Sequence, residues 1–474
     1  MRRIRSITLT VVAVAACAVG CTTAPGTAPW PPPATGPVTI TILSGTDTSI
    51  SPGSLPLHGA TGMYSELVDW WNTYEEPLTG IRVRIDAIDG GATMEHSEML
   101  AAAQAGDASY DIYNLDNEWV SEFAAGGYIR SLQGRLPEGG FLRQPLASGR
   151  DASGRLYAAP FTTDVGLLYY RSDLVPDASA LGAFWQVLQK AQQVQGDHPA
   201  MTVGYAGQFA EYEGLTVNLL EIIHGGAPGA MGPDGAIRNP AAVAAVLQKL
   251  ADELGGPIPG SEVSSYTELQ SYQAFAGGHA VFMRNWPIYY NLLTAPQSES
   301  SSTARNFGVA PLPFPSVLGG QDLATSTSSA HPAEALQVIK FLTSPQAERC
   351  LFAVGGFPAT RSSAYAANSQ LPTGYQVAGQ PAVTGHPLCG STTGRQLHIG
   401  REILQGIAGS VPRPVTPYYT EFSTLVQDQV WPLLRTASQG GNTNVGGAVN
   451  ALATDIQAAL SGHAAPLSRY VTVR

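Results

Sequence analysis

The residues of this chain that could do chemistry are carboxylates and aromatic rings, without a recognisable catalytic set. The 474 residues include 36 Asp and Glu, 19 Tyr and 7 Trp. The sequence contains no G-x-S-x-G, H-E-x-x-H, G-x-x-x-x-G-K or dinucleotide-binding motif. Its nine histidines lack the spacing of metal ligands, so neither a metal nor a cofactor is expected. Carboxylates that hydrogen-bond hydroxyls, and aromatic rings that cover apolar ring faces, instead suit the binding of a hydroxyl-rich solute.

Such groups belong in loops at strand ends that face a cleft, and the chain supplies strands of this kind. From Val38 on, β-branched strands alternate with amphipathic helices, which predicts an α/β fold with a parallel sheet flanked by helices. The segment 45–62 is rich in Gly, Ser and Pro and is either an insertion or a binding loop. The expected order is strand 38–43, helix 63–74, strand 81–85, helix 95–105 and strand 110–115.

Later helices are bounded by capping residues. Asn239-Pro240 is an N-cap followed by proline at the first helical position. Gly277-Gly278 suits a left-handed C-cap after the helix 266–276. A further helix is expected to begin at Ser344-Pro345 and to end at Gly355-Gly356.

The N-terminus carries the marks of export. Three arginines precede the uncharged apolar run 7–20, which is too short to span a bilayer comfortably and predicts a signal peptide over residues 1–20. The run ends in Ala-Val-Gly-Cys21, which resembles the bacterial lipobox, so we expect Cys21 to be lipidated. An ordinary secretory signal that happens to hold a cysteine is the alternative. The proline-rich segment 21–37 is then an extended tether between membrane and globular body.

Charge and length limit the remaining possibilities. The net charge is −11 and only three residues are lysines, so the chain is a poor nucleic-acid binder. No second hydrophobic span is present in the sequence, and 44% hydrophobic residues in a chain of this length suffice for two domains with real cores. Cys17 leaves with the signal and Cys21 is lipidated, so Cys350 and Cys389 remain to form a disulfide outside the cytoplasm.

A set of ordered segments carries a family resemblance. Together they resemble the extracellular solute-binding proteins of carbohydrate ABC importers, and within these the trehalose/maltose-binding proteins. Each segment is weak alone, but their order and spacing cover almost the whole chain after residue 38. The segments are Leu115–Trp119, Arg155–Pro160, Asp164–Arg171, Tyr212–Leu215, Arg284–Pro287, Gly308–Pro313, Gly355–Pro358 and Val411–Tyr419.

The resemblance implies a periplasmic-binding-protein-like fold, in which two α/β lobes joined by crossing strands close on a ligand. Mapped by similarity, the crossings fall near Thr162, Trp286 and His331. The expected first lobe is then 38–162 plus 287–331. The expected second lobe is 163–286 plus 332–474.

The resemblance also implies a set of ligand-binding residues in the cleft. For several of them a structural role competes: an N-cap for Asp116 and Asn117, a helix start for Glu213, a C-cap for the two glycines and a salt bridge for Arg413. Asp164 opens an apolar strand, a costly place for a charge that has no partner and no wet cleft. The expected set is Asp116, Asn117, Asp164, Glu213, Asn285, Trp286 as a stacking ring, Gly355, Gly356, Phe357 and Arg413.

Three departures keep the identity of the solute open. Thr162, Ile288 and Gln321 stand where proteins that this chain resembles carry aromatic rings. A disaccharide or related glycoside is expected, and a glycerophosphodiester or amino sugar is the alternative within the binding class. A surface glycoside-active enzyme is the alternative outside it, because so many carboxylates always permit a catalytic pair. The expected protein is an extracytoplasmic, lipid-anchored monomer whose partners are the solute and the permease subunits.

Overall fold

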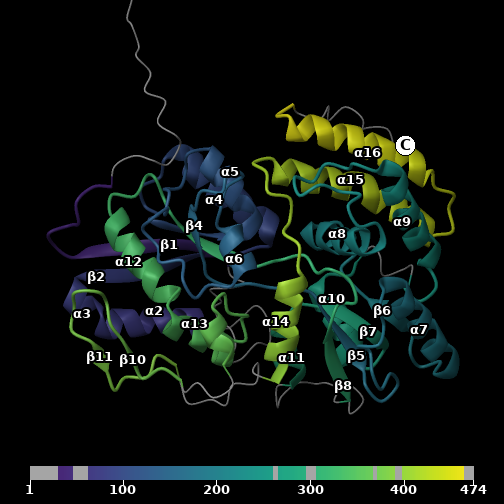
Figure 1. The fold of residues 1–474 in the computed structure, drawn as a ribbon, viewed down its shortest axis with the longest axis horizontal. Helices are drawn as coiled ribbons and strands as arrows, with labels where there is room; N and C mark the ends of the chain where they lie inside the picture. Colours follow the sequence, from purple (N-terminus) through teal and green to yellow (C-terminus); the bar gives the residue numbers. More distant parts are fainter. Residues whose placement is uncertain are drawn as a thin grey trace, which may run out of the picture.

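The computed structural model describes residues 30–45, 62–259, 265–294, 306–366, 371–389 and 398–463. Two α/β bodies lie side by side, each built on its own sheet (Figure 1). Cys21, the expected signal peptide and nearly all of the loop 45–62 lie outside the described residues. Among the described residues, no helix combines the length and apolar character needed to cross a bilayer.

The first lobe is built on a five-stranded sheet in the order β2-β1-β3-β9-β4. β1 pairs in parallel with β2 along its whole length and with β3 at its end, which confirms the parallel α/β pattern expected for this part of the chain. β9 then pairs antiparallel with both β3 and β4. The strands are β1 (Val38–Gly45), β2 (Ile81–Ile88), β3 (Ile112–Asp116), β4 (Ala158–Pro160) and β9 (Gln321–Thr325).

The second lobe is built on a four-stranded sheet in the order β6-β7-β5-β8. β5 lies between β7 and β8 and pairs antiparallel with both, whereas β6 and β7 run parallel. The strands are β5 (Leu167–Arg171), β6 (Val203–Ala206), β7 (Ala280–Asn285) and β8 (Phe307–Pro311).

Helices cover both sheets. In the first lobe they are α2 (Met63–Tyr74), α3 (Glu76–Thr79), α4 (Ala92–Ala105), η1 (Asn117–Trp119), α5 (Val120–Ala125), α6 (Arg143–Ser148), α12 (Pro332–Leu342) and α13 (Pro345–Cys350). In the second they are α7 (Phe184–Asp197), α8 (Glu213–Gly226), α9 (Pro240–Glu253), α10 (Glu268–Ala276), α11 (Ile288–Thr294), α14 (Gly400–Gly409), α15 (Tyr419–Ser438) and α16 (Val445–Leu460). Short elements complete the list: η2 (Leu351–Gly355), η3 (Ser362–Tyr365), β10 (Gly374–Tyr375) and β11 (Val383–Thr384).

The apolar stripes expected from the sequence form the cores. Leu67, Trp70 and Trp71 of α2 are buried against Ile40 of β1 and Phe341 of α12. Burying each such side chain contributes about 1.5–3 kcal/mol. The helices α8, α9, α15 and α16 form the corresponding core of the second lobe.

The expected helix caps are present. The side chain of Asn239 accepts a hydrogen bond from the backbone N–H of Ala242 at 3.1 Å. Ser344 does the same for Ala347 at 3.1 Å at the start of α13. Gly278 has φ 78° after α10, a left-handed conformation that glycine adopts without steric cost.

The structure corrects two of the expected lobe boundaries. The crossings expected near Trp286 and His331 are wrong, because β8 pairs with β5 and belongs to the second sheet. The helix α12, expected in the second lobe, instead packs its apolar stripe into the core of the first. The chain passes between the two sheets at 161–163 and again at 318–320. The sequence did not predict the second crossing, because the strands that pair on either side of it are far apart in the chain and no local pattern indicates which sheet each one joins.

The second of these crossings requires glycine. Gly320 has φ 117°, and a Cβ atom there would lie 2.3 Å from the carbonyl oxygen of Thr162. Asp164 and Gly319 exchange two backbone hydrogen bonds of 2.9 Å, so the two crossing segments are paired through their backbones. The two crossing segments, 161–163 and 318–320, therefore lie in close contact, and together they are called the hinge below.

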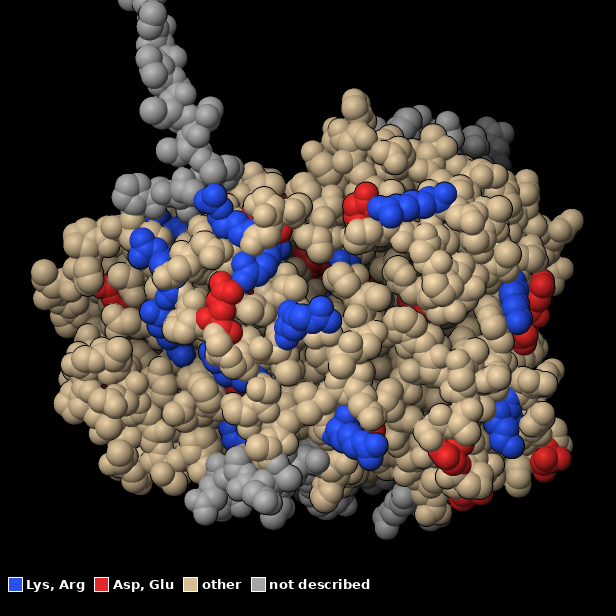
Figure 2. Space-filling model, viewed as in Figure 1, with Lys and Arg blue, Asp and Glu red and all other residues tan. Residues whose placement is uncertain are grey.

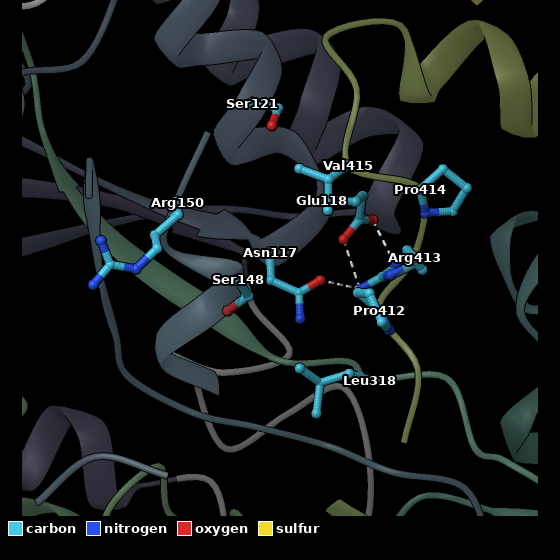
Figure 3. Close-up of a pocket in the computed structure, with 10 residues that line it drawn as sticks. All are labelled: Asn117, Glu118, Ser121, Ser148, Arg150, Leu318, Pro412, Arg413, Pro414 and Val415. Atoms are coloured by element: carbon cyan, nitrogen blue, oxygen red, sulfur yellow. Dashed lines mark hydrogen bonds and ion pairs between the residues drawn. The ribbon is translucent and has the colours of Figure 1, made fainter. Parts of the chain in front are cut away.

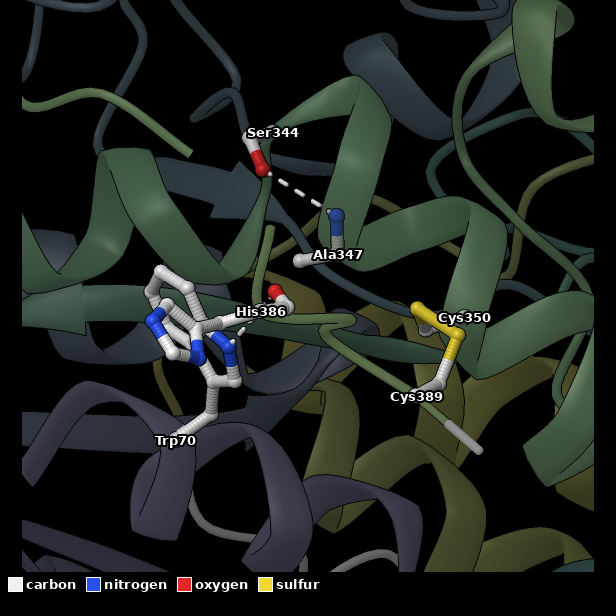
Figure 4. The surroundings of a disulfide bond; sticks show 6 residues. All are labelled: Trp70, Ser344, Ala347, Cys350, His386 and Cys389. Atoms are coloured by element: carbon white, nitrogen blue, oxygen red, sulfur yellow. Dashed lines mark hydrogen bonds between the residues drawn. A yellow bond between two sulfur atoms is a disulfide. The ribbon is translucent and has the colours of Figure 1, made fainter. Parts of the chain in front are cut away.

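The expected disulfide joins Cys350 to Cys389, with 5.7 Å between their Cα atoms (Figure 4). Cys350 ends α13 and Cys389 lies in the segment after β11, so the bond ties this segment to the first lobe. The same segment contacts α2, where the indole N–H of Trp70 donates to the carbonyl of His386 at 3.2 Å. The prediction of this pairing is confirmed.

Candidate ligand-binding site

Arg413 lies at the centre of a buried polar cluster between the lobes. Its Nη2 donates to Asp116 Oδ1 at 2.7 Å and to Asn117 Oδ1 at 2.9 Å. Its Nη1 donates to Glu118 Oε1 at 2.6 Å and to Glu213 Oε1 at 3.3 Å. Asp116, Asn117 and Glu118 belong to the first lobe and Glu213 to the second, so one guanidinium contacts both. These five residues are called the Arg413 cluster below. Figure 3 shows the contacts of Arg413 with Asn117 and Glu118.

Local structure holds each member of this cluster in place. Asp116 ends β3 and caps η1, since its Oδ1 also accepts from the backbone N–H of Asn117 at 2.9 Å. Glu213 is the first residue of α8. Prolines on both sides of Arg413 fix their own φ angles, and Val411 is hydrogen-bonded to the second crossing segment through Leu318 and Ser316. The capping role of Asp116 and the salt bridge of Arg413, both considered as structural alternatives, are thus present.

The second-lobe wall of the cluster comes from α15. Tyr419 Oη donates to Glu213 Oε1 at 2.5 Å, and Ser423 Oγ donates to Glu213 Oε2 at 2.6 Å. Both oxygens of this carboxylate are therefore held by hydrogen bonds. Ser423 lies one helical turn after Tyr419, which is why both reach the same carboxylate.

Burial sets the electrostatics of the cluster. It raises the pKa of Glu118 well above its ordinary value, against the opposing effect of the Arg413 guanidinium. Burial likewise raises the pKa of Glu213, while Arg413, Ser423 and Tyr419 oppose this shift. For Arg413 burial acts to lower the pKa, but the neighbouring carboxylates of Asp116 and Glu118 outweigh it and keep the guanidinium charged.

A small cavity opens beside the cluster. The Asn117 amide and the Glu118 carboxylate point toward Arg413, whereas the guanidinium of Arg150 points away from it (Figure 3). Figure 2 shows that this face is hollowed between the two lobes, with acidic and basic side chains visible inside the hollow. The lining residues are Asn117, Glu118, Ser121, Ser148, Arg150, Leu318, Pro412, Arg413, Pro414 and Val415.

A second group of expected residues gathers around Gly319. A Cβ atom at Gly319 would lie 3.3 Å from the Cβ of Asp164 and 3.6 Å from the Trp286 ring, so these two side chains flank the same glycine. Asn285 is fully buried and accepts from the backbone N–H of Trp286 at 2.9 Å. Asn285 therefore positions the segment that carries Trp286.

Contacts with Arg284 and Glu268 fix the orientation of the Trp286 ring. The guanidinium carbon of Arg284 lies 3.9 Å from the ring centroid, and Glu221 holds this arginine with two hydrogen bonds of 2.7 and 3.0 Å. The indole N–H donates to Glu268 Oε1 at 3.3 Å. Trp286 itself stays partly exposed, so its orientation is fixed while some of its surface remains accessible.

The third group of expected residues lies where the first lobe meets α11, since a Cβ atom at Gly356 would lie 2.0 Å from Nδ2 of Asn291. Gly356 has φ 82°, and its backbone N–H donates to the carbonyl of Leu351, which closes the π-helix Leu351–Gly355. Phe357 is buried in the first-lobe core. The C-cap alternative considered for Gly355 and Gly356 is thus present.

The sequence reasoning missed several residues of the site. Glu118 stands two positions after Asp116, but its burial against an arginine 295 positions away carries no local signal. Tyr419 closes a segment that supported the family resemblance, and Ser423 follows it by one turn. Within the described residues, no group of His, Cys, Asp and Glu side chains could hold a metal ion.

Sequence comparison defines the class of protein. The chain belongs to the bacterial extracellular solute-binding protein family, whose profile matches residues 61–349. A probable ABC transporter-binding protein of Deinococcus radiodurans is 33% identical over 264 residues, which cover 52% of this chain and 61% of that protein. The match therefore spans less than two thirds of this relative. Membership of the family implies an extracytoplasmic binding protein and not an enzyme.

Solved structures share the fold. Maltose-bound MalE3 of T. maritima has a TM-score of 0.70 and 24% identity, covering 88% of this chain and 99% of that chain. A solute-binding protein of Thermotoga lettingae bound with α-D-tagatose has a TM-score of 0.68 and 17% identity, covering 89% and 99%. The expected two-lobed periplasmic-binding-protein-like architecture is thereby confirmed.

Proposed function

We propose that this protein captures a carbohydrate between its lobes and delivers it, as a monomer, to the permease of an ABC importer. The observation that carries the proposal is the Arg413 cluster, in which polar side chains of both lobes meet at one point. The names of similar solved structures, bound with maltose or α-D-tagatose, agree with a carbohydrate as the solute, and maltose in particular is a disaccharide.

In the proposed mechanism, sugar hydroxyls exchange with the contacts that the site residues now make to one another. Asp116, Asp164 and Glu213 accept from hydroxyls, Arg413 donates to sugar oxygens, and Trp286 covers an apolar ring face. A solute favours the closed arrangement only to the extent that it contacts both lobes at once. The paired segments at Asp164 and Gly319 form the hinge about which the lobes move.

Calorimetric titration with trehalose, maltose, other disaccharides and glycerophosphodiesters tests the solute class. We expect a disaccharide to bind and to raise the melting temperature. Trp286→Phe should weaken binding roughly tenfold, because a smaller ring covers less of the sugar. Trp185→Phe is the matched control, since Trp185 of α7 also packs on the second-lobe core but lies against Lys249 of α9, 4.4 Å from its ring centroid. The proposal fails if no sugar binds at millimolar concentration or if only the glycerophosphodiester does.

We further propose that a lipid on Cys21 holds the protein at the membrane. Two acyl chains give stable attachment, and the proline-rich segment 21–37 then keeps the lobes within reach of the permease. Mass spectrometry of the mature protein should find a diacylated N-terminal cysteine, and Cys21→Ser should move the protein from the membrane fraction into the medium. An unmodified N-terminus in the membrane fraction would contradict lipid anchoring.

A further inference from the structure

The Arg413 cluster contains more negative than positive charge. Three carboxylates, those of Asp116, Glu118 and Glu213, surround one guanidinium. The side chains of Glu118 and Arg413 are 1% and 5% exposed, and those of Asp116 and Glu213 are 18% and 19% exposed. Within the described residues, the other groups that hydrogen-bond these carboxylates, Asn117, Tyr419 and Ser423, are uncharged. One arginine therefore balances only one of three acids.

Such an excess is unfavourable in a buried cluster where the two lobes meet. Burial of an ionised carboxylate costs free energy unless a cation or several hydrogen bonds compensate it. Glu213 has donors on both oxygens from α15, and Asp116 has the backbone N–H of Asn117. Glu118 is the most buried of the three, and within the described part of the chain its partners are Arg413 and the neighbouring carboxyl group of Asp116. The cluster thus needs either a bound proton or a second cation near Glu118.

A separate observation shows that the cluster is incomplete as a hydrogen-bonding unit. Within the described part of the chain, the Nε–H of Arg413 is buried and makes no hydrogen bond. The same side chain lines the cavity together with Asn117 and Ser148. The cavity lining therefore places the Glu118 carboxylate beside several donors, among them the Asn117 amide and the Ser148 hydroxyl, and next to the unsatisfied Nε–H of Arg413.

We propose that the preferred solute is an amino sugar, whose ammonium group lies against Glu118 and Asp116 while a neighbouring ring oxygen or hydroxyl accepts from Arg413. This inference rests on the proposed function and specifies the class of carbohydrate. An ammonium supplies the missing positive charge and up to three donors to the carboxylates, whereas a neutral hydroxyl supplies one.

The surroundings of Trp286 also favour a solute whose ammonium group lies at the Arg413 cluster. One face of Trp286 is covered by the Arg284 guanidinium at 3.9 Å. A positive charge on one face of an indole weakens the attraction of its other face for a second cation. The uncharged ring of the solute is therefore directed to Trp286, and its ammonium to the Arg413 cluster.

Binding by this mode releases a proton. When Glu118 carries a proton in the solute-free cluster, the incoming ammonium replaces it, and the proton passes to the buffer while the ion pair forms. Among the described residues, the titratable and charged groups that face Glu118 are Asp116, Glu213 and Arg413, with Tyr419 beyond Glu213 and Asp322 beyond Asp116. Arg150 lines the same cavity, but its guanidinium points away from Glu118 and pairs with Glu138 at 2.6 Å (Figure 3). A neutral disaccharide leaves this proton in place.

Calorimetry of the mature protein with trehalose and its 2-, 4- and 6-amino derivatives tests the inference. We expect at least one amino derivative to bind tenfold or more tightly than trehalose at pH 7 and low salt. Titrations in two buffers of different ionisation enthalpy should show proton release with that derivative and none with trehalose. Binding of trehalose as tightly as every amino derivative, without proton release, would overturn the inference and leave the proposed function standing. Binding of neither would overturn both.

A pair of variants tests the assignment to Glu118. Glu118→Gln removes one carboxylate, so the ratio of amino-sugar to trehalose affinity should fall at least fivefold. Glu76→Gln changes the net charge equally but lies at the surface beside Arg82, so it should leave the ratio unchanged. An unchanged ratio in a folded Glu118→Gln protein, verified by its melting curve, would contradict the assignment, and the wild-type titrations decide the inference even if this variant does not fold.

Discussion

Thr162 Oγ1 donates a hydrogen bond to Gln321 Oε1 at 2.5 Å, and the backbone N–H of Gln321 donates back to Thr162 Oγ1 at 3.2 Å. These are two of the three positions where an aromatic ring was expected from the resemblance. The structure shows that they are partners in the crossing segments of the hinge. A polar pair has therefore taken the place of two expected rings, which accords with a site that depends more on charge and hydrogen bonds than on stacking.

The pair should stabilise the hinge cooperatively. Thr162→Val removes the donor, Gln321→Met removes the acceptor, and each is expected to lower the free energy of unfolding by about 1 kcal/mol. Because both changes delete the same hydrogen bond, the double variant should lose about 0.5–1.5 kcal/mol less than the sum. Urea unfolding of the four proteins measures this coupling, and strict additivity would show that the contact contributes nothing.

Arg413 is expected to matter for stability as well as for binding. Arg413→Met leaves three carboxylates without a cation, which should cost about 3–5 kcal/mol and weaken sugar binding at least a hundredfold. Arg413→Lys keeps the charge but cannot reach four side chains at once, so it should bind weakly while melting closer to the wild type. Thermal unfolding and calorimetry of both variants measure these effects.

Two controls separate the charge imbalance from general disruption. Arg82→Met removes a 59% exposed arginine paired with Glu76 and should change stability by less than about 1 kcal/mol. Adding Glu118→Gln to Arg413→Met removes one of the unbalanced acids, so the double variant should be more stable than Arg413→Met alone. If the double variant is less stable than Arg413→Met alone, the loss of stability comes from packing and not from unbalanced charge.

Two buried acids should make the protein less stable as pH rises. Burial raises the pKa of Asp322 to about 8, against the hydrogen bond from Ser148. Burial also raises the pKa of Glu348 to about 8, against its hydrogen bonds from Thr360. In the unfolded chain both groups ionise near pH 4, so the stability they contribute is complete below that pH and is lost as pH rises through about 8. The melting temperature should therefore fall by several degrees between pH 5 and pH 9.

Neutral isosteres identify the responsible groups. Asp322→Asn can still accept the Ser148 hydroxyl but cannot ionise, so its melting temperature should vary less over the same pH range. Asp173→Asn is the contrasting control, because the hydrogen bond from Arg171 lowers the pKa of Asp173 and its contribution is lost only in acid. A pH profile of Asp322→Asn that is parallel to the wild type would refute the assignment.

Much of the fold could be predicted from local patterns. The stripe of α2, the N-caps at Asn239 and Ser344 and the alternation of strands and helices from β1 to β3 all depend on residues close in sequence. The lobe boundaries could not, because β8 reaches its partner β5 after some 140 intervening residues and its own composition does not indicate which sheet it joins.

The binding site, too, was only partly predictable from the sequence. Asp116, Asn117, Glu213 and Arg413 were expected from the resemblance, and the structure brings them together. Sequence alone could not show that they contact one another, nor that Glu118 takes part, because those contacts join segments up to 297 positions apart.

The disulfide should stabilise the first lobe without forming part of the site. Cys350 and Cys389 are 39 positions apart, and closing a loop of this length contributes about 4 kcal/mol in the chain-entropy model. Replacing both cysteines with serine, or reducing the bond, should therefore lower the melting temperature by several degrees, with the same loss by either route. Reduction of the double variant is the control and should change nothing further. Solute affinity should stay within about twofold at 25 °C, because both cysteines are buried in the first-lobe core, where the bond ties the segment after β11 to α13. A large loss of affinity in the folded variant would place this segment in the binding mechanism.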